Sequence, residues 1–346
     1  MTMLSPFSYD LPPDRIAQRP LHPYDAARLL LARRCDGVIG ESTFADLGSF
    51  LRSGDQLILN DTKVLPARFL GTIEKTGGAI EVLILHEQAT CQWECIGKPL
   101  KRFRPGMVLC FGDRLRARVE QKLSSERVLL SFFALSGDVH VLMHEVGSMP
   151  IPPYIRQGRG DEDDRLDYQT MFAQQEGSVA APTASLHFTP RLVEGLKARG
   201  VGLEFITLHV GAASFLPLWH EEGDEPRKPG IEHFRYSTRI LERIKDTRRQ
   251  GGRVIAVGTT VVRALESMAR CAGADEGTLL STELFINPGH EFKAIDCLIT
   301  NFHQPRTTHL LLVQALMGED LLRSSYDYAL AHGFRFLSYG DGMLIE

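Results

Sequence analysis

The sequence predicts an α/β protein in which an open α/β sheet domain carries an inserted small antiparallel β-barrel domain. Beyond about residue 165, strand-like and helix-like segments alternate, which is typical of a largely parallel sheet covered by helices. Between residues 67 and 135, short strand-like runs recur with turn signals between them and no long helical pattern. The chain of 346 residues is also longer than one hydrophobic core usually serves. We therefore expect a discontinuous α/β domain of residues 1–66 and 151–346, and a barrel domain of residues 67–150.

The inserted segment contains six runs with the length and spacing of strands, at residues 67–74, 79–86, 91–96, 107–111, 115–122 and 128–134. Turn signals such as Thr76-Gly77-Gly78 and Pro105-Gly106 separate them. This pattern fits a small antiparallel barrel or a sandwich. In the α/β part, periodicity predicts strands at 56–59, 203–210, 253–257 and 294–300, and helices at 191–199, 239–250, 261–270 and 308–317.

The overall charge excludes a globally basic nucleic-acid binder, because 39 Lys and Arg face 43 Asp and Glu, a net charge of −4. Basic charge is nevertheless concentrated locally. Residues 98–118 hold seven basic residues against the single acid Asp113, a local charge of +6. A second run contains Arg243, Lys245, Arg248, Arg249 and Arg253. Such runs are commonly solvated faces, but two of them in an acidic protein favour a partner with a phosphate backbone.

The cysteines predict reduced thiols and a cytoplasmic protein, because six of them are scattered through a long chain without a visible secretion signal. The apolar runs are too short to span a membrane. Cys91 and Cys95 could share one face of a strand, a spacing that no common zinc site uses. His140 and His144, which precede Glu145, would suit a helical metal face, but a structural role is the commoner one. We therefore expect no metal site.

Polar residues follow four of the predicted strands, at residues 60–63, 209–211, 258–260 and 301–303. If these strands are parallel neighbours, the four groups converge at one edge of the sheet, where ligands of α/β proteins bind. At Gly258-Thr259-Thr260 a Thr could cap the following helix, whose free amides would favour an anion, although many such turns bind nothing. No GxGxxG stands at a strand–helix junction and no GxxxxGK[ST] occurs, so ordinary nucleotide-binding loops are not supported.

The segment 177–188 consists of small, nearly uncharged residues and contains His187 near its end. Small residues allow close approach of the backbone to a ligand. The alternative is a tightly packed loop in which His187 is merely hydrogen-bonded in the core.

Residues 60–68, Asn-Asp-Thr-Lys-Val-Leu-Pro-Ala-Arg, resemble the NDTKVxPAR signature of the S-adenosylmethionine:tRNA ribosyltransferase-isomerase family (QueA) of queuosine biosynthesis. Further similar stretches occur in the expected order at residues 9–12, 16–18, 168–170, 177–189, 207–211, 253–267, 298–305 and 336–344. The chain departs from the family pattern at four places: Ser185, Ala213-Ser214, Gly230-Ile231 and 304–308.

The resemblance implies an enzyme that transfers and isomerises the ribosyl moiety of S-adenosylmethionine onto 7-aminomethyl-7-deazaguanine (preQ1) at the tRNA wobble position. The products would be epoxyqueuosine-tRNA, adenine and methionine. It implies an α/β domain with an inserted six-stranded barrel. It also implies no metal and no separate cofactor, because S-adenosylmethionine is consumed as a substrate. The expected partners are preQ1-containing tRNA and S-adenosylmethionine, and we expect a cytoplasmic monomer without membrane contact.

The same resemblance suggests roles for individual residues. Our hypothesis is that four residues supply proton transfer and orientation: Asp61, His187, His209 and His303. Eight residues would bind substrate: Asn60, Lys63, Arg68, Thr183, Thr259, Thr260, Arg263 and Asn301. Among them, the three cations would hold carboxylate or phosphate, and the two adjacent threonines would cap a helix facing the methionine carboxylate. Four cations of the insert would contact tRNA: Lys98, Lys101, Arg102 and Arg104.

Two other functions remain compatible with the residues. One is a non-catalytic tRNA-binding protein that retains the family fold, suggested by the departures near Ser185 and Gly230. The other is an S-adenosylmethionine-dependent methyltransferase, which the missing glycine loop disfavours.

Overall fold

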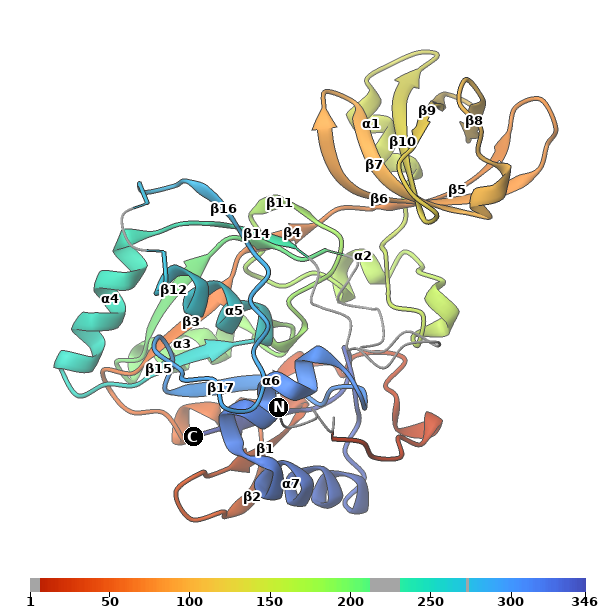
Figure 1. Ribbon diagram of the computed structural model, residues 1–346. Coiled ribbons are helices and arrows are strands. Elements are labelled where there is room, and N and C mark those ends of the chain that lie inside the picture. The colour runs from red at the N-terminus through yellow and green to blue at the C-terminus, as the bar shows by residue number, and fades with distance from the viewer. Residues whose placement is uncertain (1–6, 212–230, 272–273) are drawn as a thin grey trace. The chain divides into compact units, whose positions relative to one another are not determined.

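The computed structural model describes residues 7–211, 231–271 and 274–346 (Figure 1). The chain divides into two compact units. The first unit comprises Met1–Thr62, Thr170–Gln175 and Pro182–Glu346, and the second comprises Lys63–Gln169 and Glu176–Ala181. The second unit is larger than the predicted 67–150 insert. Its extra residues are held to it by their own contacts, since Gln169 Oε1 accepts from the Val64 amide at 2.9 Å and Ser178 O accepts from the Leu65 amide at 2.9 Å.

The first unit is built on a seven-stranded sheet. Its spatial order is β12 (Gly202–Ile206), β3 (Gln56–Asn60), β15 (Val254–Val257), β17 (Cys297–Asn301), β18 (Gly342–Ile345), β1 (Arg28–Ala32) and β2 (Ile39–Thr43). The first four strands are parallel neighbours, β18 runs antiparallel to β17, and β1 runs parallel to β18. Every residue of β3, β15 and β17 is buried, as expected for parallel strands covered on both faces. The predicted largely parallel sheet is therefore confirmed, with mixed pairing at one side.

Among the described residues, five helices accompany this sheet: α3 (Pro190–Ala198), α4 (Thr238–Arg249), α5 (Thr259–Met268), α6 (Thr308–Met317) and α7 (Glu319–Ala331). The four predicted helices correspond to α3, α4, α5 and α6, and α7 adds one that the periodicity did not indicate. Hydroxyl side chains start three of them, because Thr189, Ser237 and Thr307 each accept a hydrogen bond from an amide of the first turn. No helix within the described ranges is long and apolar enough to span a membrane.

Two small sheets and several 3-10 helices also occur in the structure. A three-stranded sheet contains β13 (Leu208–His209), β14 (Glu232–Arg235) and β16 (Leu279–Thr282), and a two-stranded sheet contains β4 (Thr62–Val64) and β11 (Gln175–Ser178). Short 3-10 helices lie at η1 (Pro13–Arg15), η2 (Tyr24–Ala26), η3 (Phe44–Ser49), η4 (Leu100–Arg102), η5 (Arg156–Gly158) and η6 (Thr183–Ser185).

The second unit contains a closed antiparallel barrel, seen in Figure 1 as the strands around β10. Its order is β10 (Arg127–Ala134), β7 (Gln92–Lys98), β6 (Ala79–Ala89), β5 (Arg68–Ile73), β8 (Val108–Phe111) and β9 (Leu115–Lys122), with β9 pairing back to β10. The six predicted strand runs are thus confirmed as a barrel. Phe69, Phe111 and Phe132 pack together with ring centroids 5.5–5.8 Å apart. Gly71 is required here, because a Cβ would lie 2.4 Å from the Cys110 carbonyl oxygen.

The expectation that Cys91 and Cys95 share a strand face is wrong. Cys91 lies in the turn before β7 with a left-handed φ of 59°, whereas Cys95 is buried within β7. The left-handed residue turns the chain tightly between β6 and β7, so the strand begins one residue later than the pattern predicts.

A buried carboxylate joins the beginnings of two central strands. Asp55 precedes β3 and accepts from the amides of Arg52 at 2.8 Å and Arg253 at 2.9 Å, and from Arg253 Nη2 at 2.7 Å. Arg253 also donates to Glu346 Oε2 at 2.8 Å and to the Phe50 carbonyl at 2.9 Å. Burial by itself would raise the pKa of Asp55, but the hydrogen bonds from Arg253 and the two amides lower it below its ordinary value.

We predict that Asp55→Asn lowers the free energy of unfolding at pH 7 by about 3 kcal/mol, because it removes one partner of a buried ion pair. A carboxyl whose folded pKa is depressed stabilises the fold above its unfolded pKa, about 3.9, and loses this effect as pH falls through the folded value. The difference between variant and wild type should therefore shrink below about pH 4. Urea titrations at several pH values measure it.

The matched control is Asp246→Asn, which removes the partner of exposed Arg249 on α4. Exposed pairs contribute little, so its cost should stay below about 1 kcal/mol at every pH. Equal costs for the two variants would contradict the importance of the buried pair.

Candidate active site

The polar groups that follow four strands lie at one edge of the first unit's sheet. Strands β12, β3, β15 and β17 are adjacent and parallel, so their carboxyl ends point the same way. Asn60 and Asn301 end β3 and β17, and residues 61, 207–209, 258–260 and 302–303 follow the four strands. The predicted convergence is confirmed for these residues, and this edge is where open α/β sheets bind ligands. Lys63, which the prediction included, belongs instead to the second unit.

Asn60 fastens the end of β3 to β13. Its Nδ2 donates to the Leu208 carbonyl at 2.9 Å, and its Oδ1 accepts from the amides of Leu208 and Thr62, both at 3.1 Å. The side chain is fully buried, and these bonds use both ends of the amide. Asn60 therefore sets the geometry of its neighbours and has little capacity left for a ligand.

Asp61 and His209 lie on either side of this Asn60 junction. Asp61 Oδ1 accepts from Thr207 Oγ1 at 2.7 Å, and His209 Nδ1 lies 2.9 Å from Thr62 Oγ1. Burial raises the pKa of Asp61, against the opposing effect of the Thr207 hydroxyl. Burial, followed by the charges of Arg235 and His233, lowers the pKa of His209, so its ring is neutral at pH 7. Both side chains can accept a proton there.

His187 is buried and already engaged. Its ring stacks on Phe44 with centroids 4.1 Å apart, and its Nε2 lies 3.3 Å from Asn301 Nδ2. Thr183 Oγ1 donates to Asn301 Oδ1 at 2.8 Å, which sets the orientation of the amide. Burial, with the charge of Arg335, lowers the pKa of His187 to about 3, against a hydrogen bond to a backbone carbonyl. His187 is thus a neutral ring hydrogen-bonded in the core, which is the alternative that the sequence left open.

His303 occupies a similar environment after β17. Its Nε2 lies 2.8 Å from Thr300 Oγ1, its ring stacks on His309 at 5.3 Å, and its backbone amide donates to Tyr326 Oη at 2.9 Å. Tyr9 donates its hydroxyl proton to the His303 carbonyl. Burial, and then His309, lowers the pKa of His303 well below its ordinary value. Its environment favours a neutral ring that orients other groups.

The expectation that Thr259 and Thr260 cap α5 is wrong. Gly258 occupies the N-cap position with φ 95°, and no side chain caps the helix. A residue with positive φ between a buried strand and a helix requires glycine, so the threonines move into the first turn, where both are buried. The first-turn amides of α5 therefore lack a side-chain acceptor, which keeps this helix end suited to an anion.

The three cations proposed to hold anions each have a carboxylate partner. Arg263, on α5, pairs with the buried Glu232 of β14 and donates to the Leu284 carbonyl at 3.1 Å. Lys63 pairs with Glu176 at 2.8 Å and Arg68 with Glu81 at 3.0 Å, and these four residues belong to the second unit. Burial raises the pKa of Glu232, and the Arg263 charge opposes this. Sequence reasoning missed Glu232 as the partner of Arg263, because the two residues are distant in sequence and no local pattern pairs them.

The two basic runs differ in the structure. Lys98, Lys101, Arg102 and Arg104 are exposed, and within the described part of the chain none of them forms an ion pair. Arg102 donates to the Ala79 carbonyl at 3.0 Å. In the second run, by contrast, four of the five cations pair with carboxylates: Arg243 with Glu204, Arg248 with Asp296, Arg249 with Asp246, and Arg253 with Asp55. Of the two runs, only the one in the barrel unit contains a cluster of cations that have no carboxylate partner among the described residues.

Comparison with known proteins shows the family to which the chain belongs. A family model described as "Queuosine biosynthesis protein" matches residues 4–345. This chain belongs to the queuosine biosynthesis protein family. A relative from Symbiobacterium thermophilum named S-adenosylmethionine:tRNA ribosyltransferase-isomerase is 44% identical over 99% of both chains. A relative of the same name from Caulobacter vibrioides is 43% identical over 99% of this chain and 98% of its own.

The fold of this family member also matches a solved one. The crystal structure of S-adenosylmethionine tRNA ribosyltransferase from Thermotoga maritima is 32% identical, with a TM-score of 0.55 over 98% of this chain and 99% of that one. Of the departures from the family pattern, Ser185 is fully buried in η6. Positions 213, 214 and 230 lie outside the described residues.

We predict that His187 stays neutral at all pH values above about 4, because its folded pKa is about 3. The unfolded chain takes up this proton near pH 6.5, so the residue lowers stability as pH falls below 6.5, by about 2 kcal/mol at pH 5. His187→Asn should therefore weaken the pH dependence of unfolding by about one proton between pH 6 and 4. Urea titrations measure the slope, and nitrogen-15 NMR reports the ring. An unchanged slope together with a ring that titrates near 6 would contradict this.

Proposed function

We propose that this chain transfers and isomerises the ribosyl moiety of S-adenosylmethionine onto preQ1 at the tRNA wobble position. The enzyme is an S-adenosylmethionine:tRNA ribosyltransferase-isomerase of queuosine biosynthesis. The observation that carries this is similarity at 44% identity along 99% of both chains. The convergence of proton-accepting groups and an uncapped helix at one sheet edge supports it.

The proposed reaction determines which groups the site must supply. The sulfonium of S-adenosylmethionine acidifies the adjacent ribose C5′ protons, so a base can remove one and adenine can then leave. The substrate amine joins the rearranging sugar, and methionine departs as the epoxide closes. The reaction therefore needs a base, a proton donor for adenine and groups that hold the methionine end.

Asp61 and His209 suit the proton transfers best. Burial makes the Asp61 carboxylate more basic, and a general base works best when its pKa approaches the working pH. His209 is neutral, and only its Nδ1 is engaged among the described residues, which leaves Nε2 to exchange a proton. His187 and His303, whose rings are buried and hydrogen-bonded, are assigned to orientation.

Substrate binding is assigned to the same edge of the sheet. The first-turn amides of α5, beside Thr259 and Thr260, would accept the methionine carboxylate. Arg263 would assist as a charge-assisted donor held in place by Glu232. Thr183 and Asn301, which are hydrogen-bonded to each other, would line the site with Asn60 behind them. We also propose that Lys63 and Arg68, which belong to the second unit, bind an anionic group of the substrates, for which they would exchange their present carboxylate partners.

The uncompensated cations of the barrel would contact the tRNA backbone. Lys98, Lys101 and Arg104 are exposed without carboxylate partners in the described residues, and Arg102 adds a fourth charge. Each such cation displaces a counterion from the nucleic acid, which provides affinity without sequence specificity. We further propose that S-adenosylmethionine is the consumed co-substrate with no separate cofactor, and that the enzyme acts as a monomer in the cytoplasm, where tRNA is modified.

We predict that the protein, incubated with S-adenosylmethionine and preQ1-modified tRNA, releases adenine and methionine. Asp61→Asn should slow adenine release by about 10²-fold or more, because general base catalysis contributes about 10²–10⁴ in rate. The amide keeps the shape and can still accept from Thr207, so the fold should persist. Chromatography of the small products measures both outcomes.

The other functions give different products. S-adenosylhomocysteine would identify a methyltransferase, and tRNA binding without any small product would identify a non-catalytic tRNA-binding protein. Wild-type rates in both Asp61→Asn and His209→Gln would overturn the assignment of proton transfer to this corner.

We predict that Lys101→Glu with Arg104→Glu weakens tRNA binding and reduces the slope of log affinity against log salt by about two, since each phosphate contact contributes about one. Lys245→Glu on α4 is the control, because it also reverses an exposed charge but lies on the first unit. Fluorescence anisotropy at several salt concentrations measures the slope. Loss of slope in the control, or none in the barrel variant, would place the tRNA contact elsewhere.

A further inference from the structure

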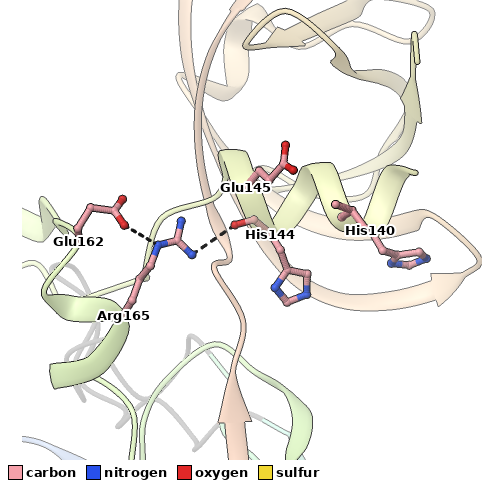
Figure 2. Close-up of a pocket in the computed structure, with 6 residues that line it drawn as sticks. His140, His144, Glu145, Glu162 and Arg165 are labelled. Carbon is pink, nitrogen blue, oxygen red and sulfur yellow. Dashed lines mark hydrogen bonds and ion pairs between the residues drawn. The ribbon is translucent and has the colours of Figure 1, made fainter. Parts of the chain in front are cut away.

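A pocket of about 540 Å³ in the second unit has no role in the proposed catalysis. Its lining residues are His140, Val141, His144, Glu145, Glu162 and Arg165 (Figure 2). The first four come from α1 (Val139–Val146), and the last two come from the segment that forms α2 (Asp164–Asp167). Its volume lies within the range of roughly 300–1,000 Å³ that holds small molecules in proteins.

Three planar groups border this pocket. His140 and His144 are four residues apart on α1, and Figure 2 shows their imidazoles on the same side of the helix. The Arg165 guanidinium is held in position by Glu162 Oε2 at 3.0 Å and by the carbonyls of His144 at 3.3 Å and Gly147 at 2.9 Å. These bonds use Nε, Nη1 and Nη2, so the plane of the guanidinium is set before any ligand binds.

The charges around the pocket are balanced. Glu145 pairs with Arg114 at 2.8 Å, and Glu162 pairs with Arg165 at 3.0 Å. A phosphate would therefore meet carboxylates as well as cations here. Residues 7–211, 231–271 and 274–346 contain no group of three His, Cys, Asp or Glu side chains placed to hold a metal.

The remaining surface of the pocket suits a flat, uncharged ligand. Val141 is 55% exposed and gives an apolar wall, and the His144 side chain is 44% exposed. Imidazole and guanidinium planes are groups on which unpaired RNA bases stack, and carboxylate oxygens accept from the N–H groups of base edges. A nucleobase has this combination of a planar face and a polar edge.

We propose that this pocket binds an unpaired nucleobase of the tRNA substrate. The inference rests on the proposed function for the identity of the nucleic acid. We favour a tRNA base over the adenine of S-adenosylmethionine as the ligand of this pocket. The reason is that the pocket belongs to the unit that carries Lys98, Lys101 and Arg104. Asp61, Thr259 and Arg263, which are assigned to S-adenosylmethionine at the sheet edge, belong to the other unit. Barrel cations would hold phosphates, and the pocket would hold a base.

The test is His144→Ala with a tRNA transcript carrying unmodified guanine at the wobble position. Loss of one stacking surface should weaken tRNA binding about tenfold. The salt slope should stay unchanged, because stacking releases no counterions. His144→Phe, which retains a ring, should restore most of the affinity. His86→Ala, which removes a half-exposed imidazole elsewhere on the barrel, is the matched control and should bind like wild type.

Other outcomes would overturn the inference. Unchanged tRNA affinity in His144→Ala would exclude a stacking role. A weakened affinity with reduced salt slope and no rescue by Phe would indicate a phosphate contact. Weaker binding of S-adenosylmethionine or free adenine, with tRNA binding intact, would assign the pocket to the small substrate.

The proposed function is tested separately by adenine release from the wild type. If His144→Ala weakens tRNA binding but the wild type releases no adenine, the base pocket stands and the catalytic proposal fails. If adenine is released and His144→Ala binds tRNA like wild type, the catalytic proposal stands and the pocket inference fails.

Discussion

The parallel pairing of β3 with β12 and β15 is the constraint on which the site depends. Parallel neighbours must end at the same edge, so residues distant in sequence, such as Asp61, His209 and Thr259, are delivered to one side of the sheet. The side-chain amide of Asn60, at the end of β3, also fixes the position of β13, because it hydrogen-bonds both the carbonyl and the amide of Leu208. A shift of one residue in the β3 register would turn every side chain to the opposite face and remove this junction.

Burial then determines the chemistry of the groups that gather there. Taking charge out of water raises the pKa of Asp61 and lowers those of His187, His209 and His303. Both kinds of shift favour the uncharged form, and because the histidine pKa values are lowered, the three imidazoles carry little positive charge. Positive potential comes instead from the first-turn amides of α5 and from Arg263, whose charge is shared with Glu232. Such a site can hold a carboxylate and also tolerate a cationic sulfonium.

Whether a basic residue is available to bind a partner depends on its ion pairs as well as on its position in the sequence. The net charge of −4 excludes a broadly basic surface, yet two basic runs stand out in the sequence. On α4 the cations face carboxylates of neighbouring segments, for example Glu204 and Asp296, and so mainly stabilise the fold. Lys98 and Lys101, at the end of β7 and in η4, form no ion pair within the described residues. This difference is the reason why we propose the barrel as the unit that contacts the tRNA.

The sequence by itself determined the α/β class, the six barrel strands and the four helices of strongest periodicity, because period and turn chemistry are local properties. It also determined the family, since the motif at residues 60–68 and the later stretches occur in order along the chain. Only the tertiary structure decided that Gly258 rather than a threonine occupies the N-cap position of α5, that Arg263 is paired with Glu232, and that the second unit begins at Lys63. It alone placed His144 and Arg165 around one pocket. These facts depend on contacts between residues far apart in sequence, which no local pattern encodes.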